Sequence, residues 1–228
     1  MASLFIAIGP AQAAGLAPAP APIQSRPVAA AAQPAATVVH PGEQYVIADK
    51  TLCSAGFAVT NAAGRAGFVS AGHCGASGDA VQTPGGAAMG TFVASSFPGT
   101  DYGWVAINPQ FAAAATVTRH NGTVAAVHGD AAAPVGSPVC MSGQASGWHC
   151  GTITAVNQSV QYEQGIVSGL TATTVCTDAG DSGGAFVSGD QAQGVVSGGV
   201  GDCSSNGATY FEPVVPILAA YGLTLRTG

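Results

Sequence analysis

The chain has 228 residues, a net charge of −6 and only 7% charged residues. Its few Lys and Arg side chains are scattered, which excludes a nucleic-acid groove. The 33 glycines and the 47% of hydrophobic residues suit short strands and tight turns better than helices. The composition therefore indicates an all-β fold, in one large domain or two small ones.

The first 14 residues resemble the end of a signal peptide. An apolar run from Leu4 to Ile8 precedes Ala11-Gln12-Ala13, which is a typical cleavage pattern. The run is shorter than the usual ~7–15 residues and follows no basic residue. We interpret residues 1–14 as a remnant or truncated signal peptide whose natural start lies upstream. The alternative is a disordered Ala-rich tail.

Residues 15–37 are almost entirely Ala and Pro. Such a segment cannot bury enough surface to offset the entropy of ordering it, so we predict a disordered linker or pro-segment. Residues 38–228 have a more varied composition and are predicted to form the folded domain.

Short apolar runs bounded by Gly, Asn or Pro predict many strands in this domain. They cover residues 56–59, 66–69, 103–107, 116–118, 123–127, 151–154, 165–167, 185–187 and 194–196. Such a series is typical of a sandwich or barrel. Residues 214–221 have helical spacing, with Gly222 as a C-cap. No other stretch approaches the ~18 apolar residues of a membrane helix, so no membrane partner is expected.

Six cysteines lie between Cys53 and Cys203. They form no C-x-x-C pair, and no His stands at zinc-finger spacing, so we predict disulfides in an oxidising compartment and no metal or other cofactor. Their spacing leaves all of the roughly 15 possible connectivities open.

Three strings, each occurring once, carry residues suited to acyl transfer. They are Ser-Ala-Gly-His-Cys-Gly at 70–75, Thr-Asp-Tyr-Gly-Trp-Val at 100–105 and Gly-Asp-Ser-Gly-Gly at 180–184. A serine hydroxyl needs an adjacent base, and imidazole has a suitable pKa. A buried carboxylate then orients the imidazole. These roles fit Ser182, His73 and Asp101, while the N–H groups of Gly180 and Ser182 could form an oxyanion hole.

Each string by itself is a weak signal. A lone histidine is more often structural, and we expect that role for His40, His120, His128 and His149. The conjunction of three strings, in the order His, Asp, Ser and on an all-β background, favours a catalytic triad.

With these strings, the sequence resembles the bacterial chymotrypsin-fold serine proteases, the α-lytic protease and streptogrisin family. The match runs from about residue 52 to the C-terminus and is densest at 139–143, 147–155, 180–184, 191–199 and 216–218. It implies two antiparallel six-stranded β-barrels with the active site between them. His73 and Asp101 would belong to the first barrel, and Ser182 to the second.

The resemblance also implies disulfides and a substrate site. The family's bridges would correspond to Cys53–Cys74, Cys140–Cys150 and Cys176–Cys203. Substrate would pair as an added strand with Ser197, Gly198 and Gly199, and Ser197 would also bond to Asp101. Thr177 and Val196 would line the pocket for the P1 side chain. Neither is bulky or charged, so we expect apolar P1 residues; Asp178 is set aside as part of a loop.

The resulting hypothesis is a secreted, extracellular serine endopeptidase that acts as a monomer on polypeptides through an acyl-enzyme. One alternative is an inactive homologue that serves as an extracellular binding module. Another is a structural or adhesion domain with accidental triad strings. An esterase of another fold is disfavoured by the chain order and by the lack of G-x-S-x-G after a βα pattern.

Two features depart from the family pattern. Many members carry a long folded pro-region that is needed for folding. Either this domain folds without such a region, or its pro-region is missing from this sequence. Met141 stands where the family has an arginine that pairs with the carboxylate corresponding to Asp181. A buried carboxylate without a cation is unfavourable. The N-terminal amine could replace the arginine, hydrogen bonds alone could hold Asp181, or Asp181 could be partly neutral. We expect a less firmly held oxyanion loop.

Overall fold

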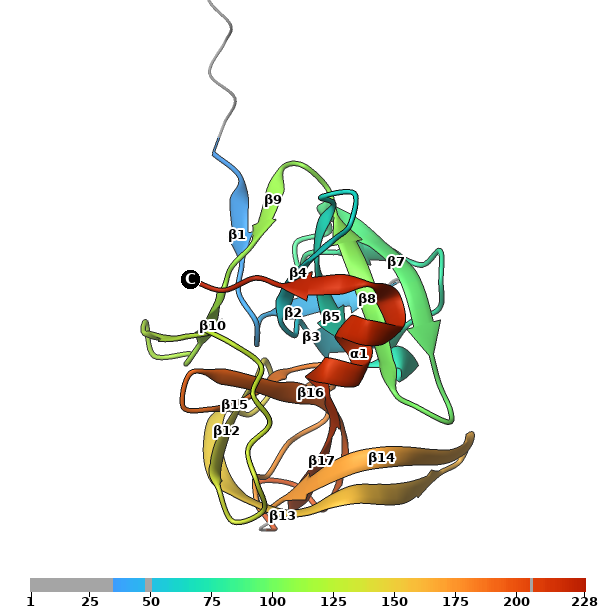
Figure 1. Ribbon diagram of the computed structural model, residues 1–228. Coiled ribbons are helices and arrows are strands. Elements are labelled where there is room, and N and C mark those ends of the chain that lie inside the picture. Colours follow the sequence, from blue (N-terminus) through green and yellow to red (C-terminus); the bar gives the residue numbers. More distant parts are fainter. Residues whose placement is uncertain (1–34, 48–50, 206) are drawn as a thin grey trace, which may run out of the picture. The chain divides into compact units, whose positions relative to one another are not determined.

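The computed structural model describes residues 35–47, 51–205 and 207–228. The predicted signal-peptide remnant lies outside these residues, as does nearly all of the predicted linker. Thr37, the last residue of that linker, begins β1 (Thr37–Val39), which pairs in parallel with β9 (Phe111–Ala113). The described domain is almost entirely β-structure, as the composition predicts (Figure 1).

An eight-stranded sheet forms the first half of the domain. Its order is β18-β4-β5-β8-β7-β6-β2-β3, and neighbouring strands are antiparallel. The strands are β2 (Gln44–Ile47), β3 (Thr51–Ser54), β4 (Ala58–Asn61), β5 (Ala66–Ser70), β6 (Ala80–Gln82), β7 (Ala88–Ser96), β8 (Tyr102–Ile107) and β18 (Leu223–Leu225). The sheet has more strands than the six that the resemblance implies, partly because the C-terminal β18 adds to the edge of β4. Tyr45, Phe68 and Phe92 pack together in its core.

A closed six-stranded barrel forms the second half, in the order β12-β13-β14-β17-β16-β15. Its strands are β12 (Pro138–Gly143), β13 (Gly147–Tyr162), β14 (Gly165–Thr173), β15 (Ala185–Ser188), β16 (Gln191–Val200) and β17 (Ala208–Pro213). Phe186, Phe211 and the fully buried Met141 lie in its core. The β13–β14 hairpin projects well beyond the barrel (Figure 1).

A third group of apolar residues joins the two halves. It contains Trp104 from the first sheet, Phe57 from the link just before β4, Val195 from the barrel, and Ile217 from α1 (Val214–Tyr221). The helix has the predicted bounds, and Gly222 follows it with φ 60°, donating to carbonyl oxygens of the last turn. The predicted helix and its cap are thus confirmed. Among the described residues, no helix has the length and apolar character needed to cross a membrane.

The strands predicted at 116–118 and 123–127 stand apart from both large sheets. They form β10 (Thr116–Thr118) and β11 (Val124–Ala126), which pair only with each other among the described strands. They belong to the segment that connects the first sheet to the barrel, so the short apolar runs predicted their strand conformation but not their partner.

Candidate active site

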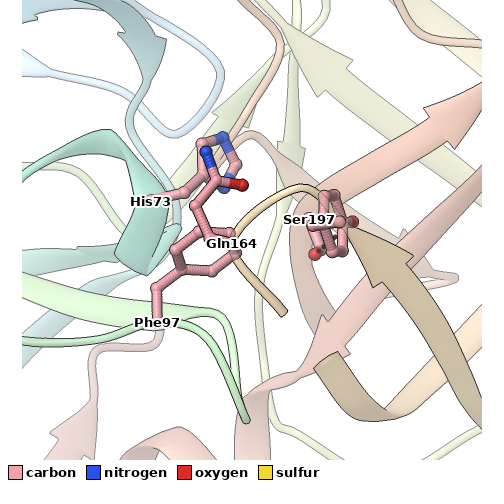
Figure 2. Close-up of a pocket in the computed structure, with 5 residues that line it drawn as sticks. His73, Phe97, Gln164 and Ser197 are labelled. Atoms are coloured by element: carbon pink, nitrogen blue, oxygen red, sulfur yellow. Dashed lines mark hydrogen bonds between the residues drawn. The ribbon is translucent and has the colours of Figure 1, made fainter. Parts of the chain in front are cut away.

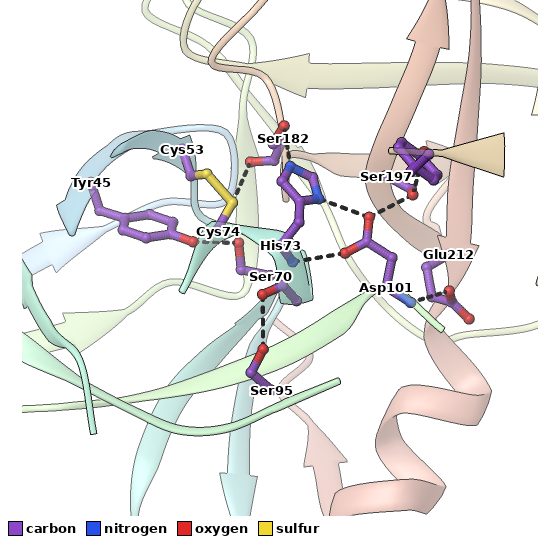
Figure 3. Close-up of polar contacts among 12 residues, drawn as sticks. Tyr45, Cys53, Ser70, His73, Cys74, Ser95, Asp101, Ser182, Ser197 and Glu212 are labelled. Atoms are coloured by element: carbon purple, nitrogen blue, oxygen red, sulfur yellow. Dashed lines mark hydrogen bonds and ion pairs between the residues drawn. A yellow bond between two sulfur atoms is a disulfide. The ribbon is translucent and has the colours of Figure 1, made fainter. Parts of the chain in front are cut away.

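Three side chains from distant parts of the sequence meet between the two halves (Figure 3). His73 lies in the 3-10 turn η1 (Gly72–Cys74), Asp101 directly precedes β8, and Ser182 lies between β14 and β15. Nε2 of His73 is 2.8 Å from Oγ of Ser182, and its Nδ1 is 2.8 Å from Oδ2 of Asp101. The His73 backbone N–H also donates to Oδ1 of Asp101. The structure therefore places the three predicted residues in one continuous hydrogen-bonded chain.

Asp101 is fully buried, and residues of the barrel form hydrogen bonds with its carboxylate and its backbone N–H. Ser197 donates its hydroxyl to Oδ2 of Asp101 at 2.6 Å, the bond that the resemblance implies. The Ser197 hydroxyl in turn accepts from that of Tyr162 at 2.9 Å. Burial raises the pKa of Tyr162, so its phenol keeps the proton that it donates. The carboxylate of Glu212 accepts from the Asp101 backbone N–H at 2.9 Å.

The loop before β15 carries the nucleophile candidate Ser182 and several backbone N–H groups whose partners can be traced. Within it, the N–H groups of Asp181, Gly183 and Gly184 donate to carbonyl oxygens. Those of Gly180 and Ser182 donate to no atom in the described part of the chain. Gly180 has φ 111°, and a Cβ there would lie 2.2 Å from the Gln144 side chain, so this position requires glycine. These two N–H groups, which find no acceptor among the described residues, are therefore available to an oxyanion formed at Ser182.

Asp181 is fully buried and is surrounded by hydrogen-bond donors. Its carboxylate accepts from the N–H groups of Ala145, Ser146 and Asp178 and from the Ser146 hydroxyl. Neither of the ion pairs found among residues 35–47, 51–205 and 207–228 involves it. Of the three arrangements considered for Asp181, the described residues form the one based on hydrogen bonds. Met141, at the position of the missing arginine, instead fills the barrel core.

A cavity of about 170 Å³ opens beside Ser182. Its lining includes the predicted substrate-binding residues Thr177, Val196, Gly198 and Gly199. Asp178, which sequence reasoning set aside, also lines it, but its carboxylate accepts a hydrogen bond from the Cys203 N–H at 3.2 Å. The pocket is small, and glycines and short side chains shape much of it.

The fifth predicted substrate-binding residue, Ser197, faces a different cavity of about 500 Å³ (Figure 2). His73, Phe97, Tyr162 and Gln164 complete the lining. The ring of Phe97 is 5.6 Å from that of His73 and 5.7 Å from that of Tyr162. This cavity therefore lies between a loop of the first sheet and the tip of the β13–β14 hairpin.

All six cysteines form disulfides, in the three pairs that the resemblance implies: Cys53–Cys74, Cys140–Cys150 and Cys176–Cys203. The remaining histidines have other partners. His40 bonds to the Thr116 carbonyl oxygen, His120 to the Ser142 hydroxyl, His128 to the Asp190 carboxylate and His149 to the Ser146 carbonyl oxygen. These contacts fit the structural roles predicted for them.

Sequence reasoning missed several residues of this site. Phe97, Tyr162 and Gln164 belong to no motif, because they come together only when the hairpin reaches the first sheet. Glu212 did leave a signal, since it is the one charged residue in the otherwise apolar run from Tyr210 to Leu218. A carboxylate in such a run indicates a buried charge with a specific neighbour.

Comparisons with known proteins agree with this geometry. The family model described as Trypsin matches residues 44–219. Streptogrisin-C of Streptomyces griseus is 48% identical over 189 residues, which are 83% of this chain and 41% of that protein. Streptogrisin-D of the same organism is 45% identical over 75% of this chain and 44% of its own length. The chain thus spans less than half of the length of these two relatives.

A solved structure, that of Thermobifida fusca Protease A, superimposes with a TM-score of 0.80 and 46% identity. The match covers 84% of this chain and 100% of that one.

Proposed function

The chain belongs to the trypsin family, in its chymotrypsin-like bacterial branch, and we propose that it is a secreted serine endopeptidase. The observation that carries this proposal is the unbroken chain from Ser182 Oγ through His73 to Asp101, beside two free N–H groups. Ser182 is the nucleophile, His73 the general base and acid, and Asp101 the carboxylate that orients His73.

The reaction follows from these positions. His73 Nε2 accepts the hydroxyl proton as Ser182 Oγ attacks the scissile carbonyl carbon. The N–H groups of Gly180 and Ser182 stabilise the oxyanion of the tetrahedral intermediate. The C–N bond then breaks, His73 gives its proton to the leaving amine, and an acyl-enzyme remains. Water attacks the ester by the same steps, with His73 again as base, and releases the acid and free Ser182.

Extended polypeptides are the proposed substrates. β15 pairs with β16 only as far as Val195, so the adjoining edge at Ser197, Gly198 and Gly199 faces no further strand of the described chain. A substrate strand can add there through backbone hydrogen bonds. The P1 side chain would then enter the cavity beside Ser182, towards Thr177 and Val196.

We propose that apolar P1 residues are preferred. Among the described residues that line this cavity there is no Lys, Arg or His to pair with an acidic side chain. The single carboxylate, that of Asp178, already accepts a hydrogen bond, which weakens the case for a basic P1 residue. Complete pairing of the cysteines favours an oxidising, extracellular location, where we expect the protein to act as a monomer.

Labelling with a fluorophosphonate probe tests the catalytic assignment. The probe should modify Ser182, and peptide mapping should find the adduct on that residue alone. Ser182→Ala and His73→Ala should abolish labelling and lower peptide hydrolysis by several orders of magnitude. Ser188→Ala, which alters a half-buried serine at the end of β15 in the same barrel, is the matched control. Absence of labelling in the folded parent protein would favour the inactive binding module.

A peptide library tests the substrate class. Cleavage products should have apolar residues at P1, and their mixture should show internal cleavage rather than removal of terminal residues. A profile dominated by Glu, Lys or Arg at P1 would refute the apolar preference while leaving the endopeptidase assignment intact. Sedimentation of the labelled protein would test the monomeric state.

A further inference from the structure

A second buried carboxylate lies directly against the triad. Glu212 is in β17, is only 3% exposed, and accepts a hydrogen bond from the backbone N–H of Asp101 through Oε2 at 2.9 Å. Figure 3 shows it beside Asp101 on the side away from His73. Neither ion pair in the described part of the chain includes Glu212. A carboxylate in this position is costly to ionise, because water is excluded and Asp101 is a like charge.

The titratable groups around Glu212 come from several elements. Asp101 faces it from the loop before β8 and Tyr162 from the end of β13, while Tyr210 precedes it by two residues in β17. Strands β14 and β16, which flank β17, carry no titratable side chain. In β8 and α1 the titratable groups are the phenols of Tyr102 and Tyr221, whose rings pack against each other. Neither β8, β14, β16, β17 nor α1 contains Lys, Arg or His, so these elements supply no cation.

The environment moves the titration of Glu212 into the neutral range. Burial is the main reason that its pKa is raised from 4.5 to about 7. The hydrogen bond from the Asp101 N–H opposes this rise, and the charge of Asp101 adds to it. Glu212 therefore gains and loses its charge over the pH range in which a histidine base also titrates.

We propose that Glu212 is a positioning residue of the triad, which fixes the backbone of Asp101 and through its charge sets the pH at which His73 becomes a free base. This inference rests on the proposed endopeptidase function. An ionised Glu212 adds a negative charge behind Asp101 and favours the imidazolium form of His73. A neutral Glu212 still offers an oxygen to the Asp101 N–H, so the geometry persists while the imidazolium loses support.

Two variants separate the positioning effect from the charge. Glu212→Gln keeps an acceptor oxygen and removes the charge, whereas Glu212→Ala removes both. The pH profile of kcat/KM for a peptide substrate should show the acid limb of Glu212→Gln shifted down by roughly 0.5–1 pH unit, with the maximal kcat within about threefold of the parent. Glu212→Ala should lose about tenfold or more in kcat at every pH, because the buried Asp101 N–H has lost its acceptor.

An unchanged acid limb in Glu212→Gln would overturn the charge effect. Equal maximal kcat values for Glu212→Ala and Glu212→Gln would overturn the positioning effect. A general loss of folding in Glu212→Ala is recognised by circular dichroism, and the Glu212→Gln profile then decides the proposal.

A measurement without turnover keeps this proposal distinct from the proposed function. In the Ser182→Ala background, ¹⁵N NMR of labelled histidines follows the imidazole of His73, which is assigned by its absence from the His73→Ala spectrum. The His73 pKa should be lower in Glu212→Gln than in the Ser182→Ala parent. An equal or higher pKa would refute the inference even if the protein were an active protease, and a lower pKa would support it even if no hydrolysis were found.

Discussion

The hydroxyl of Ser146 donates a hydrogen bond to Oδ2 of the buried Asp181. Ser146 lies in the turn between β12 and β13, and Asp181 directly precedes Ser182. The backbone N–H groups of Ala145 and Ser146 donate to the other carboxylate oxygen. The turn thus holds the loop that carries the two free N–H donors. In this protein hydrogen bonds stabilise the Asp181 carboxylate, whereas in the family pattern an arginine pairs with the corresponding carboxylate.

Removal of that hydroxyl should loosen the loop. We expect Ser146→Ala to lower the free energy of unfolding by about 1.5–3 kcal/mol, the range for a hydrogen bond to a charged group. It should also lower kcat more than it raises KM, because the oxyanion donors act in the transition state. Urea unfolding and steady-state kinetics measure both effects. Ser159→Ala, which alters an exposed hairpin serine, is the control, and identical values for the two variants would contradict the prediction.

Restoring the family arginine should not stabilise this protein. Met141 is fully buried beside Phe186 and Ile153 in the barrel core. Asp181 already accepts four hydrogen bonds, about as many as a carboxylate can. Met141→Arg must therefore bury a charge for little new bonding, and its thermal midpoint should fall.

Met141→Leu, which keeps the apolar volume, should lower the stability by less than about 1.5 kcal/mol. A Met141→Arg variant that melts above the parent would instead show that the four hydrogen bonds do not replace a cation beside Asp181.

Ser54 links the first sheet to the oxyanion loop. Its hydroxyl donates to the Gly180 carbonyl oxygen and accepts from the Gln144 N–H, both at 2.9 Å. Ser54→Ala leaves these two backbone groups without that partner, so kcat should fall by about tenfold, equivalent to ~1.4 kcal/mol. Ser159→Ala, which removes an exposed hydroxyl of the β13–β14 hairpin, again serves as the control. A kcat for Ser54→Ala that matches the Ser159→Ala value would rule out this role.

Glu212 should make the stability depend on pH. Its pKa is raised from 4.5 to about 7 in the folded protein. Between these two pH values, the folded state therefore keeps a proton on Glu212 that the unfolded state has released. This contribution is complete below about pH 4.5 and is lost as the pH rises through about 7, by up to about 3 kcal/mol.

Glu212→Gln removes that dependence. Urea unfolding at pH 5 and pH 8, in the Ser182→Ala background to prevent autolysis, should show the variant gaining stability relative to its parent at the higher pH. A constant difference between the two proteins would contradict the raised pKa.

Local patterns in the sequence were enough to predict much of the secondary structure. Residues 214–221 form the predicted helix because apolar residues at helical spacing are followed by Gly222, which adopts a left-handed conformation without strain. The strand at 116–118 likewise has its predicted bounds. The strings around His73, Asp101 and Ser182 were informative for the same reason, since each is a short, contiguous arrangement with its own chemistry.

Contacts between distant segments were decided only by the tertiary structure. Asp101 meets Glu212, and Phe97 meets Tyr162, across sequence separations that no motif spans. The sequence showed that Met141 occupies the position where the family has a cation. It could not reveal that the turn at Ser146 surrounds Asp181 with hydrogen-bond donors. Such contacts depend on how two sheets, built from non-adjacent strands, pack against each other. The energy of that packing is shared among many residues, and no single segment of the chain encodes it.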